Sequence, residues 1–408
     1  MENGTVEGST TGEPRASETG NGELKGPATG LTDKEQEGLQ SFVKQCREAG
    51  LLDRPAGLSE EDTLDGLLDD ATLLRFLAAR SFDAPGALKQ FKEAQAIRSS
   101  AKTSEAYDSI DIDDFEYLRG IYPHWSGQRT KRGLPICLLD AASLDGANLT
   151  KYRSYSASQN TCRAITSLDY LTRFALPLCN MMTDRPEPSK PVPGAVYLAD
   201  IANASLRQAW ALRGYAQSTS ALLATCYPEV VDRIYVLNAP PFFPRIWAFL
   251  KGWFDPKTAD KLVIVPPADV LSTLLKEIDI ECIPERYGGK SRDEHGLVPL
   301  VSGLKELLGV DELPEGPIKW TMHEGKRTAV AVGVKGGEAR REIIGPRNGV
   351  ETPITEKDIP EKDAAETTST EKTDTNKADI EKNVAEKDIE KSAIEISEIE
   401  TRAIEVTA

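Results

Sequence analysis

Hydrophobic positions recur at helical spacing over the first quarter of the chain. A helix is predicted to begin at Thr32, which has capping-box spacing to Glu35, and apolar residues follow every three or four positions. A second helix is predicted after Asp70, and Asp83 is a candidate N-cap for a third. Together these patterns predict a small helical module over about 32–105.

The pattern changes after residue 122 to short apolar runs, which are typical of buried strands. These runs lie at 134–139, 195–198, 234–237 and 262–265. Longer helical stretches lie between them, at 155–182, 203–226 and 241–252. Strands that alternate with helices of this length indicate crossover units and a mainly parallel sheet. The sequence therefore predicts an α/β domain over about 110–310.

Both ends of the chain differ in composition from this domain. Residues 1–31 are rich in Gly, Thr, Ser and Glu, and residues 351–408 repeat short phrases of Glu, Lys, Asp, Ala and Ile. Segments with so few large apolar side chains are typical of disordered tails. The stretch 311–350 contains strand-like pieces, such as 328–334, but its pattern does not assign it to a domain.

Most of the net charge of −16 also lies at the two ends. Residues 1–40 and 351–408 together carry 14 of the 16 excess negative charges, so the body of the chain is nearly neutral. Nucleic-acid binding needs clustered Lys and Arg side chains, so we expect no nucleic-acid partner. The acidic ends are explained equally well by solubility and by binding to a partner.

The cysteines and the missing targeting signals favour the cytoplasm. Six cysteines form no Cys-x-x-Cys pair and mostly lie inside apolar runs, as buried free thiols do in a reducing compartment. We therefore expect no metal site. The chain has no signal-peptide pattern and no run of about 18 apolar residues, so a membrane span is not predicted.

One predicted helix, at 241–252, is apolar nearly all round, unlike an ordinary surface helix. Either it is a central core helix, or it is a lid with one face toward an apolar cavity and the other toward a bilayer. Its candidate gate residues, with those that flank it, are Phe242, Phe243, Ile246, Trp247, Leu250, Trp253 and Phe254.

Several ordered motifs surround this helix. They are the segment 73–83 (Leu-Leu-Arg-Phe-Leu-Ala-Ala-Arg-Ser-Phe-Asp), Tyr-Pro at 122–123 with Gly-Leu-Pro at 133–135, Tyr-Pro-Glu at 227–229, Ile-Tyr-Val-Leu-Asn-Ala-Pro at 234–240, Phe-Asp-Pro-Lys-Thr at 254–258 and the segment 283–291 (Ile-Pro-Glu-Arg-Tyr-Gly-Gly-Lys-Ser). In this order they resemble the CRAL-TRIO lipid-transfer family, which includes fungal phosphatidylinositol/phosphatidylcholine transfer proteins. The resemblance implies a helical module followed by a lipid-binding domain with an apolar gate helix.

The resemblance also implies a site for the phosphatidylinositol headgroup. Its residues map to Arg80, Ser81, Glu229 and Lys261, and Ser81 replaces a Lys of the family. Cations suit the phosphate and a carboxylate suits the inositol hydroxyls. A structural ion pair between Glu229 and a nearby Arg, such as Arg233, is the competing role for the carboxylate.

The choline-lipid site of the family has no such match here. Its two tyrosines and two hydroxyl residues map to Ser126, Cys137, Ala195 and Tyr197, none of which is the family residue. The resemblance therefore implies a pocket whose second ligand is unidentified.

These patterns predict a monomeric carrier that binds phosphatidylinositol and transiently contacts the surface of intracellular membranes. We expect no cofactor and no enzymatic activity, because the chain has only three histidines and neither a Gly-x-Ser-x-Gly nor a His-Glu-x-x-His motif. Two alternatives stay open: a carrier of a sterol, terpenoid or other hydrophobic ligand, and a lipid-sensing signalling scaffold that presents phosphatidylinositol.

Overall fold

The computed structural model describes most of the chain between the two predicted tails. The described residues are 31–202, 208, 211–241, 243–253, 256–292, 298–323 and 325–350. The predictions for residues 1–30 and 351–408 therefore lie outside them. No helix among the described residues is both long and apolar enough to cross a membrane.

The N-terminal helices begin where the sequence predicts. Thr32 and Glu35 form the capping box of the first helix, and the Asp83 side chain accepts a hydrogen bond from the backbone N–H of Gly86. These helices and the two that follow them are α1 (Asp33–Glu48), α2 (Asp70–Ala79), α3 (Ala84–Ser100), α4 (Thr103–Ser109) and α5 (Ile112–Arg119).

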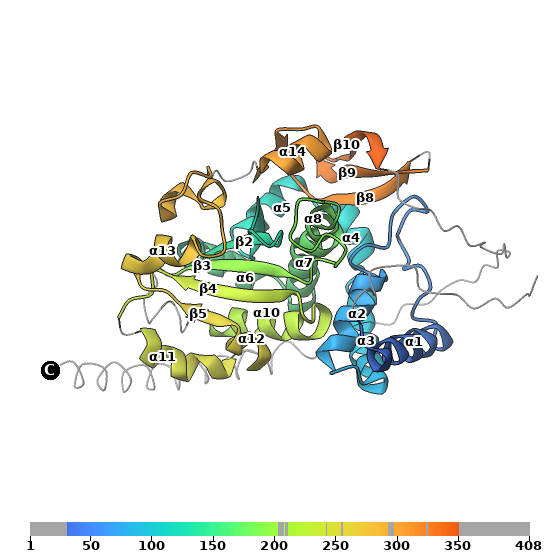
Figure 1. The fold of residues 1–408 in the computed structure, drawn as a ribbon, viewed down its shortest axis with the longest axis horizontal. Coiled ribbons are helices and arrows are strands. Elements are labelled where there is room, and N and C mark those ends of the chain that lie inside the picture. The colour runs from blue at the N-terminus through green and yellow to red at the C-terminus, as the bar shows by residue number, and fades with distance from the viewer. Residues whose placement is uncertain are drawn as a thin grey trace, which may run out of the picture.

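A small aromatic core joins the first three helices. The Phe91 ring packs edge-on against Phe76 at 5.0 Å and against Phe42 at 6.0 Å between ring centroids. All three side chains are buried, which accounts for the helical spacing of the apolar positions. The helices lie together beside α10 and α12 in Figure 1.

The central sheet has five strands in the order β1-β2-β3-β4-β5. The strands are β1 (His124–Arg129), β2 (Pro135–Asp140), β3 (Ala195–Asp200), β4 (Val231–Leu237) and β5 (Leu262–Ile264). β2 to β5 pair in parallel, which confirms the predicted α/β fold, and β1 pairs antiparallel with β2. The sequence analysis missed β1 because its residues, His-Trp-Ser-Gly-Gln-Arg, are mostly polar.

Helices and short helical turns connect these strands. Between β2 and β4 they are η1 (Ala141–Ser143), α6 (Gly146–Ser154), α7 (Ala157–Tyr170), the π-helical η2 (Leu171–Ala175), α8 (Leu176–Asn180) and α10 (Arg213–Cys226). After β4 they are α11 (Phe243–Leu250), η3 (Lys251–Trp253), α12 (Pro256–Asp260), η4 (Pro267–Asp269), α13 (Val270–Leu274), η5 (Ile280–Cys282) and η6 (Glu285–Tyr287).

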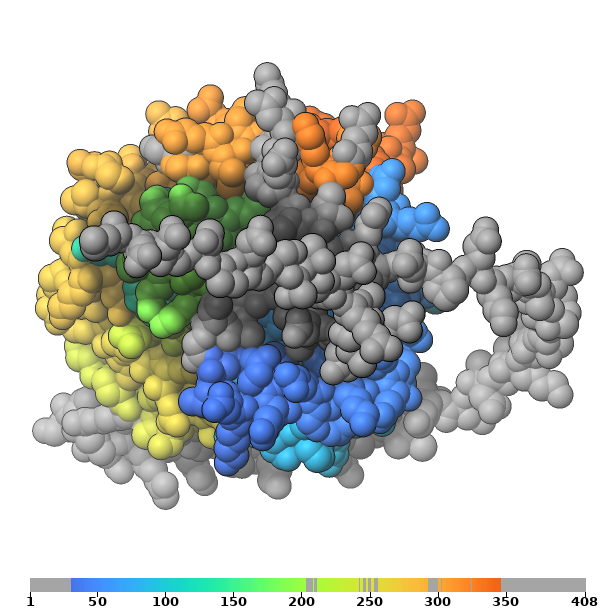
Figure 2. All heavy atoms as spheres, turned by 45° about the vertical axis from the view of Figure 1, so that its right-hand side comes forward, coloured from blue at the N-terminus to red at the C-terminus, as the bar shows by residue number. Residues whose placement is uncertain are grey.

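Most of the stretch 311–350, which the sequence does not assign, forms a second sheet. Its strands β8 (Ile318–His323), β9 (Lys326–Lys335) and β10 (Glu338–Val350) pair antiparallel in the order β10-β9-β8. The short strands β6 (Val298–Pro299) and β7 (Glu312–Leu313) and helix α14 (Ser302–Leu308) precede it. In Figure 1 and Figure 2 this orange segment lies at the top of the molecule, and the blue helices α1 to α3 lie toward the bottom.

The loop between α1 and α2 nevertheless reaches this second sheet. The Met322 N–H donates to the Glu61 carbonyl at 2.7 Å, and the Thr63 N–H donates to the Trp320 carbonyl at 3.1 Å. Trp320 in turn donates from its indole N–H to the Phe174 carbonyl at 3.2 Å. The C-terminal strands are therefore hydrogen-bonded both to the N-terminal loop and to the central domain.

Candidate functional site

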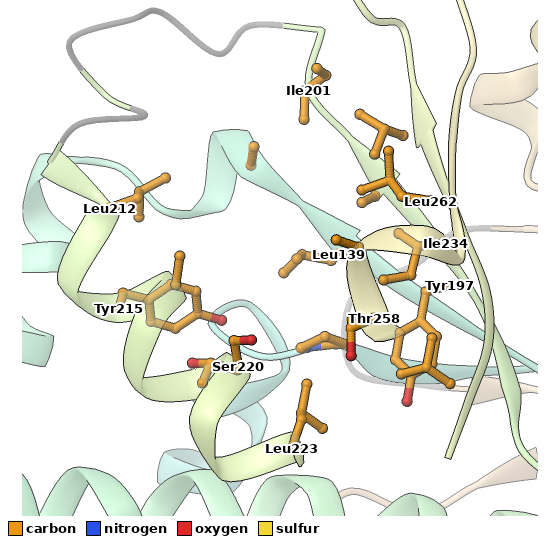
Figure 3. A pocket seen from close by; sticks show the side chains of 18 of the residues that line it. Leu139, Tyr197, Ile201, Leu212, Tyr215, Ser220, Leu223, Ile234, Thr258 and Leu262 are labelled. Atoms are coloured by element: carbon orange, nitrogen blue, oxygen red, sulfur yellow. The ribbon is translucent and has the colours of Figure 1, made fainter. Parts of the chain in front are cut away.

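An apolar cavity lies between the central sheet and helix α10 (Figure 3). Its volume is about 260 Å³. Tyr197, Ile234 and Leu262 form one row of its wall, because they are paired neighbours on three adjacent parallel strands and therefore share a face of the sheet. Tyr215 and Leu223 of α10 line the opposite wall.

Helix α11 closes part of this cavity. Phe243 and Trp247 lie one helical turn apart, stack with their ring centroids 6.4 Å apart, and line the cavity. Pro244 and Ala248 on the same helix are exposed. Of the other gate residues that the sequence suggests, Phe242 and Phe254 lie outside the described residues, as do the side chains of Ile246, Leu250 and Trp253.

A second, polar pocket of about 270 Å³ adjoins the apolar cavity. Leu223, Val231 and Thr258 line both of them, so the two spaces share part of their wall. The polar pocket brings together Arg80 from the end of α2, Glu229 from the turn before β4, and Lys261 from the start of β5. Three residues of the predicted headgroup site therefore meet in one place.

Glu229 and Lys261 form an ion pair within this pocket. The Lys261 Nζ lies 3.0 Å from Glu229 Oε2 and also donates to the Val231 carbonyl at 2.7 Å. Glu229 has a φ of +56°, a strained conformation for a residue with a side chain. The turn also requires Gly194, because a Cβ at that position would lie 2.4 Å from the Val230 carbonyl oxygen.

The competing role for Glu229, an ion pair with Arg233, is wrong. Arg233 pairs instead with Glu277, at 3.0 Å. The register of β4 against β3 shifts between Val231 and Arg233, and Arg233 lies on the opposite face of the sheet from its neighbour Ile234, which lines the apolar cavity. Ser81 is also placed differently from Arg80: it is exposed in a left-handed turn with a φ of +53°, and it is not among the pocket-lining residues.

The sequence analysis missed several polar residues of this pocket. They include Gln90 and Glu93 from α3, and Lys257 and Thr258 from α12. Gln90 is buried and donates from its amide to the Ala224 carbonyl at 2.8 Å, which ties α3 to the end of α10. The polar position inside the otherwise apolar face of α3 was the available sequence signal.

A buried network of hydrogen bonds lies next to the polar pocket. Arg98 makes two hydrogen bonds to Asp169, at 3.0 and 2.9 Å, and the Tyr227 hydroxyl donates to the same carboxylate at 2.6 Å. Burial raises the pKa of the Tyr227 hydroxyl well above its ordinary value, so it stays protonated and remains a donor. Since Tyr227 lines the polar pocket and precedes Glu229 by two residues, the network holds this turn in place.

The four residues suggested for a second ligand do not all reach a cavity. Tyr197 lines the apolar cavity, and its buried hydroxyl has no hydrogen-bond partner among the described residues. Cys137 and Ala195 are buried but are not lining residues, and Ser126 donates to the Ile136 carbonyl at 2.9 Å. The structure therefore retains only Tyr197 as a residue that could contact a ligand in this cavity.

The cysteines are all free and are buried or half-buried. Burial raises the pKa of every one of these thiols, for example that of Cys46 and that of Cys179 to about 12 and that of Cys226 to about 11. They are therefore protonated at neutral pH. The described part of the chain contains no cluster of His, Cys, Asp or Glu side chains suited to a metal ion.

The part of the chain that contains the central sheet is similar in sequence to known proteins. Residues 122–289 match the CRAL/TRIO domain. The SEC14 cytosolic factor of Candida glabrata is 28% identical over 263 residues, which cover 64% of this chain and 80% of that protein. The SEC14 cytosolic factor of Eremothecium gossypii is 26% identical over 271 residues, covering 66% of this chain and 81% of that protein.

A plant protein extends the similarity beyond yeasts. The Phosphatidylinositol/phosphatidylcholine transfer protein SFH9 of Arabidopsis thaliana is 24% identical over 243 residues, which cover 56% of this chain and 38% of that protein. The chain therefore contains a CRAL/TRIO domain and is homologous to the SEC14-type phosphatidylinositol/phosphatidylcholine transfer proteins.

Proposed function

We propose that this protein is a carrier that binds one phosphatidylinositol molecule and moves it between membranes, or presents it, without covalent chemistry. The observation that carries the proposal is the contact between a charged pocket and an apolar cavity. A phospholipid has the same two parts, an anionic headgroup and apolar chains. The homologous transfer proteins support the same function.

The energetics of lipid chains explain why a carrier needs such a cavity. Each CH₂ group removed from water gains about 0.8 kcal/mol, so exposing two chains of about 16 carbons would cost on the order of 25 kcal/mol. The row of Tyr197, Ile234 and Leu262 and the facing residues of α10 offer the chains an apolar medium comparable to the bilayer. Extraction of the lipid then becomes nearly neutral in free energy.

The polar pocket suits the headgroup. A phosphodiester buried without a cation would cost several kcal/mol, and Arg80 and Lys261 supply cations. The Glu229 carboxylate can accept hydrogen bonds from inositol hydroxyls. A neutral sterol or terpenoid would make no use of these three charges.

Lipid entry past α11 would require this part of the wall to move. Phe243 and Trp247 of α11 are the described side chains best placed for this role, because they line the cavity while other residues of the same short helix are exposed. We infer that α11 opens at a membrane surface, and that the protein works as a monomer in the cytoplasm with reversible membrane contact. The hydroxyl of Tyr197, which has no partner in the described part of the chain, is the proposed contact for a second ligand of unidentified class.

The test is lipid extraction and native mass spectrometry on the full-length protein, with Lys261→Ala and Glu229→Ala as variants. Phosphatidylinositol is expected at about one per chain, and both variants should lose it while they stay folded. Lys290→Ala and Glu281→Ala are matched controls, because these residues form an exposed ion pair at 2.6 Å away from the pocket. A sterol, a terpenoid or no lipid in the wild-type protein would refute the proposal, as would unchanged loading in both pocket variants.

A further inference from the structure

Lys257 is a third cation of the polar pocket, and the family resemblance assigns it no role. It lies on α12, which begins three residues after η3 and so follows the gate helix closely in the chain. Its Nζ donates to the Ala79 carbonyl at 2.7 Å, across the boundary between the lipid-binding domain and the helical module. We propose that Lys257 binds the phosphate of the headgroup, an inference that rests on the proposed function.

The charges that line the pocket support this role. Among the described lining residues, the cations are Arg80, Lys257 and Lys261 and the carboxylates are Glu93 and Glu229, which leaves one excess positive charge. A phosphodiester carries one negative charge and would be matched by that excess. Without Lys257 the cations and carboxylates would be equal in number, and the phosphate would enter with no net charge to compensate it.

Glu229 also neutralises the charge of Lys257 less than the charge of Lys261. The Glu229 carboxylate lies 3.0 Å from the Lys261 Nζ but 3.9 Å from the Lys257 Nζ. The nearest acceptor of Lys257 is a neutral carbonyl, which satisfies a hydrogen bond but supplies no counter-charge. Exchange of this carbonyl for a phosphate oxygen therefore gives the charged donor an acceptor that also carries the opposite charge.

The ammonium group can make this exchange at small cost. The Lys257 side chain is 59% exposed, so the charge is already solvated, and its flexible stem allows the Nζ to turn from Ala79 toward the pocket. Lys257 also compensates for a lysine of the family that is Ser81 in this chain. Ser81 is exposed and does not line the pocket, whereas Lys257 does. Lys257 thus supplies the third cation of the pocket from a different segment of the chain.

The experiment compares Lys257→Gln with wild type in the full-length protein. Glutamine can still donate to the Ala79 carbonyl but carries no charge. Binding from phosphatidylcholine vesicles that contain phosphatidylinositol is measured by lipid extraction at several salt concentrations. We expect Lys257→Gln to bind about three- to tenfold less phosphatidylinositol at low salt, and the difference to shrink as salt rises.

Two further variants complete the design. Lys257→Arg should bind phosphatidylinositol within about twofold of wild type, because it keeps the charge. Lys190→Gln is the matched control, since Lys190 is 55% exposed, pairs with Glu187 at 2.6 Å and lies outside the pocket. The thermal midpoints of the lipid-free proteins should agree.

Two results would overturn the inference: wild-type binding by Lys257→Gln, or a loss that does not change with salt, which would indicate a structural contact with Ala79. Failure of the proposed function looks different. If Lys261→Ala lowers binding and Lys257→Gln does not, only the role of Lys257 is lost. If the wild-type protein takes up no phosphatidylinositol, the proposed function itself fails.

Discussion

Replacement of Lys319 by Met should destabilise the protein more than any surface substitution. The Lys319 Nζ lies 2.6 Å from Asp62 Oδ2 and 2.5 Å from Asp108 Oδ2. The side chains of Lys319 and Asp62 are 1% and 0% exposed, and that of Asp108 is 30% exposed. This cluster joins β8 of the second sheet to the loop after α1 and to α4.

The size of the effect follows from what the substitution leaves behind. Met fills nearly the same volume, so the main loss is the positive charge, and Asp62 remains as a buried carboxylate beside a second carboxylate. Removal of one partner of a buried ion pair typically costs about 3 to 5 kcal/mol. The whole free energy of unfolding of a domain is roughly 5 to 15 kcal/mol, so the loss should be large.

Urea unfolding followed by circular dichroism measures the difference. Lys335→Met is the matched control, because Lys335 lies in the adjacent strand, pairs with Glu315 at 2.6 Å and is 58% exposed. That substitution should cost less than about 1 kcal/mol. The double substitution Lys319→Met with Asp62→Asn should recover part of the loss, since it removes the uncompensated charge. A free energy of unfolding for Lys319→Met within about 1 kcal/mol of wild type would refute the reasoning.

Two other predictions concern acid stability and the gate. The hydrogen bond from Arg129 holds the pKa of Asp184 below its ordinary value of 3.8, so the ion pair stabilises the fold above that pH and its contribution is lost as pH falls through the lower, folded-state pKa. Urea unfolding of Asp184→Asn should thus show a deficit of at most about 1 kcal/mol at neutral pH that disappears in acid, whereas a deficit that persists in acid would exclude this cause. Trp247→Ala should lower the loading of every phospholipid class by a similar factor, because Trp247 lines the apolar cavity and not the polar pocket; a selective loss of phosphatidylinositol in extracted lipid would contradict that placement.

Local sequence signals predicted the N-terminal helices and the parallel strands of this protein. The capping box at Thr32 and the N-cap at Asp83 are short-range hydrogen-bonding patterns, and both helices begin there. The buried parallel strands are also visible, because a strand covered on both faces is apolar at consecutive positions. Shared motifs were sufficient to select Arg80, Glu229 and Lys261, which the fold brings into one pocket.

Only the tertiary structure decided which distant segments meet. Nothing local in the sequence places Lys257 against Ala79, since they are 178 residues apart and the contact depends on how α12 packs beside α2. The same holds for Lys319. Its place in a strand does not reveal that its side chain is buried and paired with two aspartates. Side-chain contacts of this kind arise from packing between surfaces, and the free energy that selects them is spread over residues far apart in the chain.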